Sequence, residues 1–361
     1  MTWLKWKNNE IKSIQILRAI AALSVVYVHC TTAGDYNFLT TGSFGVDIFF
    51  IISGFIIAYV IEKDSSQFLL KRIFRIYPMY IIATIMMIFT VLIFPTLIKS
   101  TTISFSGFIK SILFIPGIEN RGYPILGQGW TLRFEMFFYL LMFICILIVR
   151  NKKYASLICA GFIFLFIGIA SILKPINYFI NYFCNDIILE FACGVLLFKC
   201  NKYIIKRQFK INRFAKISIC IFVAVICYGF MVFIDIKSIS VSKFRSLYYG
   251  IPSLLMVIAI LMLEINIKDT KLTRIIIEIG EASYVMYLFH YHIVIFFSRA
   301  IFNKTIGANS IFLIELTKII IAFSVTIIIS VIAYEFVDKP IQIYLRGVLK
   351  RQGLKKQRHS T

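Results

Sequence analysis

Long apolar runs, separated by short polar connectors, follow one another along the whole chain. A membrane-spanning helix needs about 20 mainly apolar residues. On that criterion the pattern predicts ten helices, at residues 14–32, 44–61, 76–98, 129–149, 154–173, 176–198, 214–236, 247–267, 283–302 and 311–337. A soluble domain of 361 residues could not bury a chain that is 60% hydrophobic. We therefore predict an all-α polytopic membrane protein, a bundle of about ten transmembrane helices.

The longest outer connector, residues 99–128, has an apolar stretch of its own at 103–116. That stretch is too short to span a membrane, so it predicts an interfacial or re-entrant segment. The eight cysteines all lie in or beside apolar runs and lack the spacing of metal ligands. We therefore expect neither a disulfide framework nor a metal site.

Basic residues form short clusters between the apolar runs, and they give a net charge of +22. Of the 39 Lys and Arg residues, 27 fall in connectors on one side of the membrane and 9 on the other. Because cytoplasmic loops carry the excess of positive charge, both termini are expected in the cytoplasm. This distribution argues against nucleic-acid binding. Residues 1–345 form one predicted transmembrane domain, and 346–361 form a basic tail on the anionic cytoplasmic leaflet.

Two ionisable residues, Arg18 and His29, interrupt the first apolar run. Eleven helical positions are about three turns and roughly 16 Å of rise, so the two side chains share one helix face. Ionisable groups are costly in hydrocarbon and usually face a polar cavity. We predict that this face lines a passage across the membrane, with Arg18 at its cytoplasmic end and His29 at its outer end.

Two carboxylates, Asp47 and Glu135, are expected near His29 at the outer end. An imidazole beside a carboxylate suits general-base catalysis, because the carboxylate orients the ring. The alternative is a structural polar pair that holds two helices together. Trp130 and Arg133 enter the membrane just before Glu135 and are candidates for binding an acceptor. Trp130 could equally be an interfacial anchor.

At the cytoplasmic end, Arg72 and Arg75 gather near Arg18. They are three positions apart, so they share a face if the third helix has already begun there. Three cations could grip the phosphates of a cytosolic ligand through bidentate hydrogen bonds. Basic residues also flank the cytoplasmic ends of membrane helices for topological reasons alone, which leaves both interpretations open.

Several short motifs follow one another along the chain. They are Arg18-x10-His29, FGVDIFFIISGF at 44–55, R-x-x-R at Arg72 and Arg75, WTLRFEMFFY at 130–139, SYVMYLFH at 283–290 and YEFVDKP at 334–340. The set resembles the acyltransferase-3 family of integral-membrane acyltransferases, which O-acetylate bacterial surface polysaccharides. Arg18 and His29 match the pair that is essential in that family.

The resemblance implies acetyl-CoA, or another acyl-CoA, as a co-substrate held by Arg18, Arg72 and Arg75, with no permanently bound cofactor. It implies a sugar hydroxyl of O-antigen, capsule, exopolysaccharide or a lipid-linked glycan as the acceptor, and a place in the bacterial plasma (inner) membrane. His29 would either deprotonate that hydroxyl or first accept the acyl group. His290, in the SYVMYLFH motif, is a further candidate for binding the acceptor.

The alternative function is a transporter or exporter of a polysaccharide intermediate, because intramembrane charges also mark transport paths. A non-catalytic membrane partner in glycan synthesis is a third possibility. Loss of an O-acetyl group from the glycan, as against loss of export, would separate these hypotheses.

Overall fold

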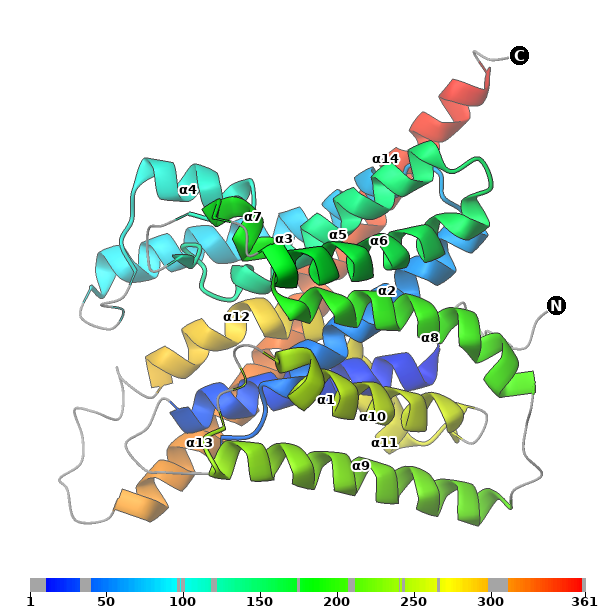
Figure 1. The fold of residues 1–361 in the computed structure, drawn as a ribbon. Helices are drawn as coiled ribbons and strands as arrows, with labels where there is room; N and C mark the ends of the chain where they lie inside the picture. Colours follow the sequence, from blue (N-terminus) through cyan, green and yellow to red (C-terminus); the bar gives the residue numbers. More distant parts are fainter. Residues whose placement is uncertain are drawn as a thin grey trace.

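The computed structural model describes residues 11–32, 40–95, 98, 101–117, 122–173, 176–206, 212–239, 241, 244–264, 267–297 and 311–358. The described residues are helical or lie in turns and loops, without any strand (Figure 1). In chain order the helices are α1 (Lys12–Thr32), α2 (Phe44–Lys63), α3 (Phe68–Ile93), α4 (Phe105–Ile112), α5 (Gly129–Ile148), α6 (Lys152–Leu173), α7 (Tyr178–Phe183), the 3₁₀ turn η3 (Asp186–Ile188), α8 (Leu189–Lys206), α9 (Arg213–Ile236), the π-helix η4 (Ser246–Gly250), α10 (Ile251–Met262), α11 (Lys271–Glu281), α12 (Ser283–Ile295), α13 (Ile311–Ala333), the π-helix η7 (Tyr334–Asp338) and α14 (Lys339–Arg358).

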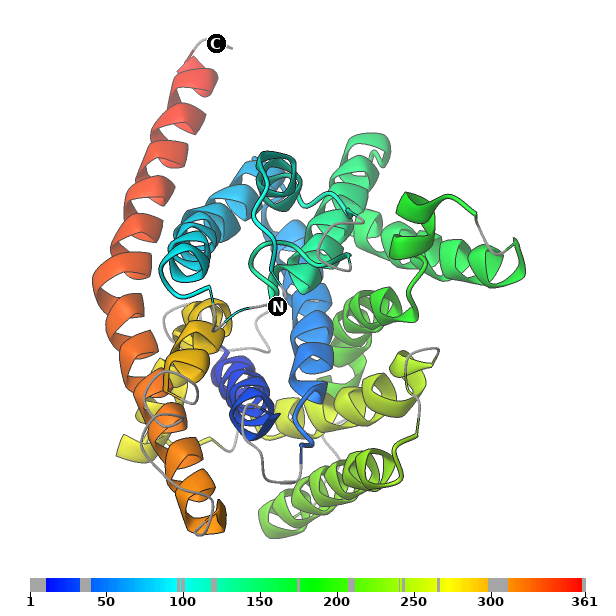
Figure 2. The ribbon, with the colours of Figure 1, turned by 90° about the vertical axis from the view of Figure 1, so that its left-hand side faces the viewer.

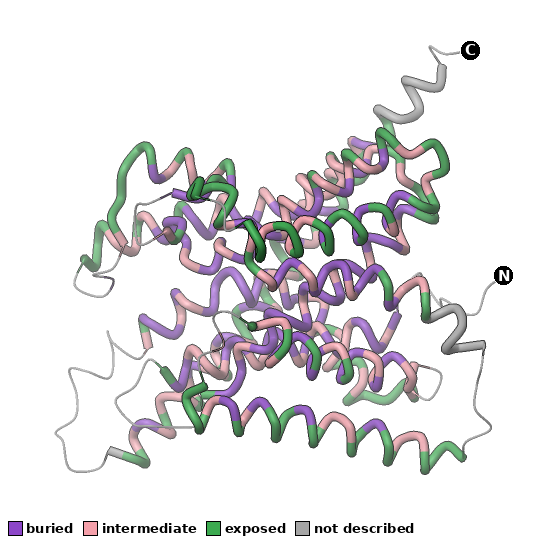
Figure 3. The backbone as a smooth tube through the Cα atoms, viewed as in Figure 1, coloured by how far each residue is buried: buried purple, intermediate pink, exposed green. Residues whose placement is uncertain are grey.

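The centre of the bundle is formed by α1 and α2, and the other long helices surround them (Figure 2). Helix α2 is apolar on nearly every side, which is typical of a helix buried by its neighbours. Its contacts run to α1, α8 and α10. Few residues of the outer helices α6, α9 and α13 are buried, and most of each helix is accordingly green or pink in Figure 3.

Large apolar side chains therefore cover the outside of the bundle, among them Phe162, Phe222 and Ile328. Such a surface is stable against lipid and unstable in water. Seven of the ten predicted spans are confirmed as helices long and apolar enough to cross a membrane: those predicted at 14–32, 44–61, 76–98, 129–149, 154–173, 214–236 and 311–337. The chain is a multi-pass membrane protein.

The other three predicted spans differ from the structure. The run at 176–198 is broken into α7, η3 and α8, because Asn185 caps a new turn with its side chain, which accepts from the Ile187 amide. The run at 247–267 becomes a shorter apolar helix, Ser246–Met262. The run at 283–302 begins as predicted with α12, but residues 298–302 lie outside the described chain. Within 103–116 lies the eight-residue helix α4, which is too short to span a membrane, and its interfacial or re-entrant position stays a prediction.

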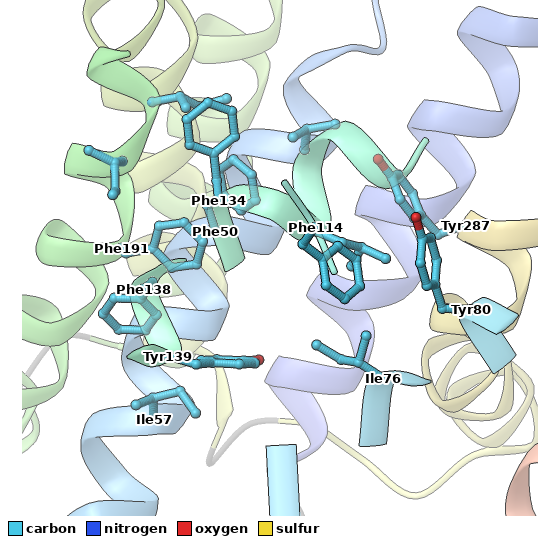
Figure 4. Close-up of a cluster of buried hydrophobic side chains, with 14 of the residues drawn as sticks. Phe50, Ile57, Ile76, Tyr80, Phe114, Phe134, Phe138, Tyr139, Phe191 and Tyr287 are labelled. Carbon is cyan, nitrogen blue, oxygen red and sulfur yellow. The ribbon is translucent and has the colours of Figure 1, made fainter. Parts of the chain in front are cut away.

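Glycines allow α2 and α8 to cross at close range. A Cβ built on Gly54 would overlap the backbone oxygen of Phe191, and one on Gly194 would overlap that of Ile51. Small residues at such crossings let helix backbones approach closely in membranes. Beside the crossing, Phe191 stacks between Phe50 and Phe138, with ring centres 4.5 and 4.6 Å away (Figure 4). The crossing fixes α2, one wall of the cavity described below.

Helix α3 begins at Phe68, well before the predicted start at 76, so Arg72 and Arg75 lie within it. Pro78 lies inside this helix and has no amide N–H to donate to the Phe74 carbonyl. The side chain of Gln342 on α14 donates to that carbonyl instead, over 3.1 Å. The proline thus creates an acceptor that joins α14 to α3.

Helices α13, η7 and α14 form one continuous rod, in which Phe312–Arg351 is a single 40-residue candidate span. At 1.5 Å per residue this rod is about 60 Å long, roughly twice the thickness of a bilayer's hydrocarbon core. The end of α14 accordingly projects from the bundle (Figure 1). The boundary predicted at residue 345 falls in the middle of α14, where the helix is unbroken.

Candidate active site

A cavity of about 930 Å³ lies between α1, α2, α3, α5, α12 and α14. Its mouth, as we call the end lined by exposed residues, is formed by the connector between α2 and α3 together with Arg346 and Lys350 of α14. Its inner end is lined by Thr131 and Tyr287. Among the described residues, six basic and two acidic side chains line the cavity, so it is strongly positive.

The three arginines predicted to gather at one end, Arg18, Arg72 and Arg75, all line this cavity. Arg75 is bound to the fully buried Asp338 over 2.7 Å, and its guanidinium lies over the Tyr284 ring. Arg18 donates to Gln15 on its own helix over 3.3 Å. The Nε atom of Arg72 is buried without a hydrogen-bond partner among the described residues. This N–H of Arg72 is therefore a donor that remains for a ligand.

Glu135 lines the same cavity, between the arginines and the inner end. Its carboxylate accepts hydrogen bonds from Ser53, over 3.1 Å, and from the Tyr139 hydroxyl. On α5 it lies one turn further in than Tyr139 and one turn short of Thr131. The expectation that Glu135 would accompany His29 is therefore only met in part, because Glu135 faces the middle of the cavity.

The closest described ring to His29 belongs to His290, with 4.8 Å between the ring centres, and Tyr291 follows at 5.7 Å. The Nδ1 atom of His290 lies 2.7 Å from the Tyr287 carbonyl oxygen and 3.2 Å from that of Met286. Carbonyl oxygens only accept hydrogen bonds, so Nδ1 carries the proton. The Nε2 atom of His290 then offers its lone pair in the neutral ring, and it has no partner among the described residues.

Tyr287 connects this histidine pair to the cavity. Its ring lies 5.9 Å from that of His290, and the same residue lines the inner end of the cavity. Its hydroxyl is held by Thr131 at 2.8 Å and by the Gln128 carbonyl at 3.1 Å. Tyr287 therefore contacts the cavity on one side and the ring of His290 on the other.

Asp47 lies elsewhere than predicted. We expected it to orient His29, but its carboxylate binds Arg245, with Nε–Oδ1 and Nη2–Oδ2 distances of 3.1 and 2.7 Å. Asp47 is completely buried, and Arg245 also donates to the Ser43 carbonyl. A buried carboxylate needs such a partner, and the polar neighbour that satisfies it is a cation rather than the imidazole.

Trp130 and Arg133 do not line the cavity in the described part of the chain. Arg133 donates to the Gly122 carbonyl and lies over the Tyr182 ring at 5.5 Å. Trp130 packs edge-on against Phe134. These contacts join the start of α5 to α7 and to the connector before α5. Of the three candidates for acceptor binding, the structure brings only His290 close to His29.

Sequence reasoning missed three partners: Arg245, Asp338 and Gln342. Arg245 counted only as an outer-connector cation, although an arginine beside a run of aromatic residues could have suggested a buried pair. Asp338 lies in the YEFVDKP motif at 334–340, and its place in that motif is the signal that could have marked it. Groups of three or more side chains suited to a metal ion are absent from the described residues.

Comparison with known proteins agrees with this architecture. The chain belongs to the acyltransferase-3 family, whose characteristic region, described as an acyltransferase domain, matches residues 11–335. The resemblance seen in the motifs is confirmed, and the protein is an acyltransferase.

Three relatives show the extent of the similarity. The chain is 26% identical over 330 residues to the exopolysaccharide production protein ExoZ of Rhizobium meliloti (strain 1021), covering 87% of this chain and 93% of ExoZ. It is 25% identical over 372 residues to SACOL0978 of Staphylococcus aureus (strain COL), covering 92% of this chain and 58% of that protein. It is 28% identical over 178 residues to the peptidoglycan O-acetyltransferase OatA of Listeria monocytogenes serovar 1/2a (strain ATCC BAA-679 / EGD-e), covering 44% of this chain and 28% of OatA. The chain thus spans less than two thirds of the length of the last two. No solved structure matches.

Proposed function

We propose that the protein transfers an acetyl or other short acyl group from cytosolic acyl-CoA to a sugar hydroxyl of a cell-surface or lipid-linked polysaccharide. The relatives support the chemistry, because one is named for exopolysaccharide production and another as a peptidoglycan O-acetyltransferase. The bias of Lys and Arg supports a mouth that faces the cytoplasm of a bacterial plasma membrane.

One observation carries the proposal: a positive cavity leads from an exposed mouth to a tyrosine that touches a histidine pair. An acyl-CoA has phosphates at one end and a thioester at the end of a long, uncharged arm. The phosphates fit the mouth and the arginines, where the charge is positive. The carboxylate of Glu135 disfavours phosphate further in, so the uncharged arm is the part that extends toward Tyr287.

The acceptor then meets the thioester at the histidine pair. In direct transfer, an imidazole takes the hydroxyl proton, the sugar oxygen bonds to the acyl carbon, and the carbon–sulfur bond breaks. The thiolate of coenzyme A leaves and takes up a proton. In a covalent relay, His29 accepts the acyl group first and passes it to the sugar. The unpartnered Nε2 of His290 suits proton transfer to or from the groups around His29.

The test is mass spectrometry of the surface glycan from cells with the protein, without it, and with His29→Ala. We expect the O-acyl mass increment to disappear in the last two, while membrane levels of His29→Ala equal those of the wild type. An unchanged increment in His29→Ala would overturn the proposal.

The alternative function, export of a glycan intermediate, can be tested in the same cells. The interruption at α7, η3 and α8 resembles the broken helices of transporters, and the neighbouring Asp186, Glu190 and Arg245 add polar groups there. Loss of the whole glycan from the surface, rather than loss of its acyl groups, would favour that function.

A further inference from the structure

One face of α14 forms part of the cavity wall. The residues that line it are Gln342, Leu345, Arg346, Leu349 and Lys350. They recur every three or four positions, so they form a single stripe along the helix. Residues 346–350 are therefore a wall of the site, whereas the sequence alone assigned them to a basic tail.

The stripe is held in register with the arginines further in. Asp338 binds Arg75 over 2.7 Å, and Gln342 donates to the Phe74 carbonyl over 3.1 Å. Both contacts fix the start of α14 against α3. From Asp338, the helical rise places Arg346 about 12 Å and Lys350 about 18 Å nearer the mouth. The cavity thus has two sets of cations, the arginines inside and these two at the mouth.

The cations around the cavity differ in whether a nearby carboxylate neutralises them. Arg75 is neutralised by Asp338, and Lys71, which lies at the mouth, is paired with Asp64 over 2.7 Å. Within the described residues, neither Arg346 nor Lys350 takes part in an ion pair. The uncompensated charge at the mouth therefore comes from α14.

We propose that Arg346 and Lys350 bind the 3′-phosphate on the adenosine of the donor and make the protein selective for coenzyme A over its 3′-dephospho form. This inference rests on the proposed function. Coenzyme A carries a diphosphate, from which the arm extends, and a phosphate monoester on the ribose at the far end. When the arm points inward, the diphosphate lies toward Arg72 and the ribose lies at the mouth. A phosphate monoester near neutral pH carries more than one negative charge, which matches two adjacent cations.

The phosphate of a lipid headgroup is the other source of this chemistry, because basic residues at a membrane surface attract anionic lipid. Arg351 distinguishes binding of a lipid headgroup from binding of the donor. It is exposed and adjacent to Lys350 in sequence, but it does not line the cavity. A headgroup would use Arg351 as readily as its neighbours, whereas a donor in the cavity would not.

The experiment is calorimetric titration of the full-length protein in nanodiscs of phosphatidylcholine alone, with coenzyme A and with 3′-dephospho-coenzyme A. We expect the wild type to bind coenzyme A at least about tenfold more tightly. In Arg346→Gln/Lys350→Gln the two dissociation constants should become equal, through weaker binding of coenzyme A. Arg346→Lys/Lys350→Arg keeps both charges and should keep most of the selectivity, and Arg351→Gln should bind as the wild type does.

Four outcomes would go against the inference or the function on which it rests, and they are distinguishable. Equal binding of both ligands by the wild type overturns the 3′-phosphate site and leaves the acyl-CoA donor in place. Selectivity that survives in the double glutamine variant also overturns the site, as does an effect seen only after phosphatidylglycerol is added, which would indicate headgroup binding. Binding of neither ligand by the wild type overturns the proposed function itself.

Discussion

The rings of His29 and His290 lie 4.8 Å apart, although they come from α1 and α12, at opposite ends of the chain. Neither has a carboxylate as its described hydrogen-bond partner. His290 is held by the backbone instead, because the carbonyls of Tyr287 and Met286 accept hydrogen bonds from its Nδ1. In hydrolases with a catalytic triad, a histidine transfers the proton and a carboxylate orients that histidine. Two imidazoles at this distance can divide the same two roles between them.

The first prediction concerns Nε2 of His290. In His290→Asn, the side-chain amide keeps a donor near the position of Nδ1 but removes Nε2. We expect transfer to fall at least about 100-fold, the usual contribution of general acid–base catalysis, with little change in thermal stability. Transfer is measured as O-acyl content of the glycan. His292→Asn, two positions along on another face of α12, is the matched control and should retain transfer. Near-normal transfer in His290→Asn would remove His290 from the mechanism.

The second prediction assigns a structural role to Asp47. Asp47→Asn leaves the cation of Arg245 without its partner in a buried place, which typically costs about 3–5 kcal/mol. Replacing both, as Asp47→Leu/Arg245→Met, should recover part of this loss, because neither member of the ion pair is then buried without the other. Thermal unfolding in detergent measures the three variants. If Asp47→Asn were inactive but as stable as the wild type, the original expectation of a catalytic Asp47 would be restored.

The third prediction couples Pro78 with Gln342. Gln342→Ala leaves the Phe74 carbonyl without a donor, which should cost about 1–3 kcal/mol. In Pro78→Ala/Gln342→Ala, the new amide at position 78 can donate to that carbonyl within α3. The double variant should therefore be more stable than Gln342→Ala alone. Additive losses in a double-mutant cycle of unfolding free energies would show that the two residues are independent.

The fourth prediction concerns the crossing of α2 and α8. Gly54→Ala forces a methyl group against the Phe191 backbone and should destabilise the protein by at least about 1–3 kcal/mol. The matched control is Gly161→Ala in α6, where a Cβ meets no atom within 4 Å. That change should be neutral or stabilise the helix by up to about 1 kcal/mol. Equal melting temperatures for the two variants would contradict the close crossing.

The fifth prediction concerns pH. Hydrogen bonds from Lys71 and Ser66 lower the pKa of Asp64, in the connector after α2, to about 2 from its ordinary 3.8. A lowered pKa means that the ion pair stabilises the folded state above about pH 4, and that this contribution disappears as the pH falls toward 2. Because the pair is well exposed, Asp64→Asn should cost at most about 1 kcal/mol. The cost should be the same at pH 5 and pH 8. A cost that changes between those two values would show that another group is involved.

The parts of the site that sequence could predict are those set by helical periodicity. Arg18 and His29 lie on one helix, and Arg72 and Arg75 lie on α3 and face the same cavity as Arg18. These positions depend on local geometry, which the spacing of residues determines. The position of Glu135 several residues inside a predicted membrane helix also predicted that its side chain would face a cavity.

The parts that sequence could not predict depend on which helices become neighbours. Asp47 and Arg245 lie in α2 and just before η4, and Arg75 and Asp338 lie in α3 and η7. Each pair forms because tertiary packing buries a carboxylate that then requires a cation. The same holds for Gln342, whose acceptor exists only because Pro78 interrupts α3. The broken run at 176–198 was missed for another reason: the apolar residues on both sides of Asn185 conceal the cap that it forms.

The rod formed by α13, η7 and α14 has a consequence for how the family could diversify. The region by which the family is recognised ends at residue 335, whereas the wall of the mouth is built from residues 342–350. A relative could therefore exchange its last helix, and with it the chemistry at the mouth, without altering the histidines or the inner arginines. Under the proposed function, chimeras joined within η7 would be a direct way to transplant donor preference from one acyltransferase to another.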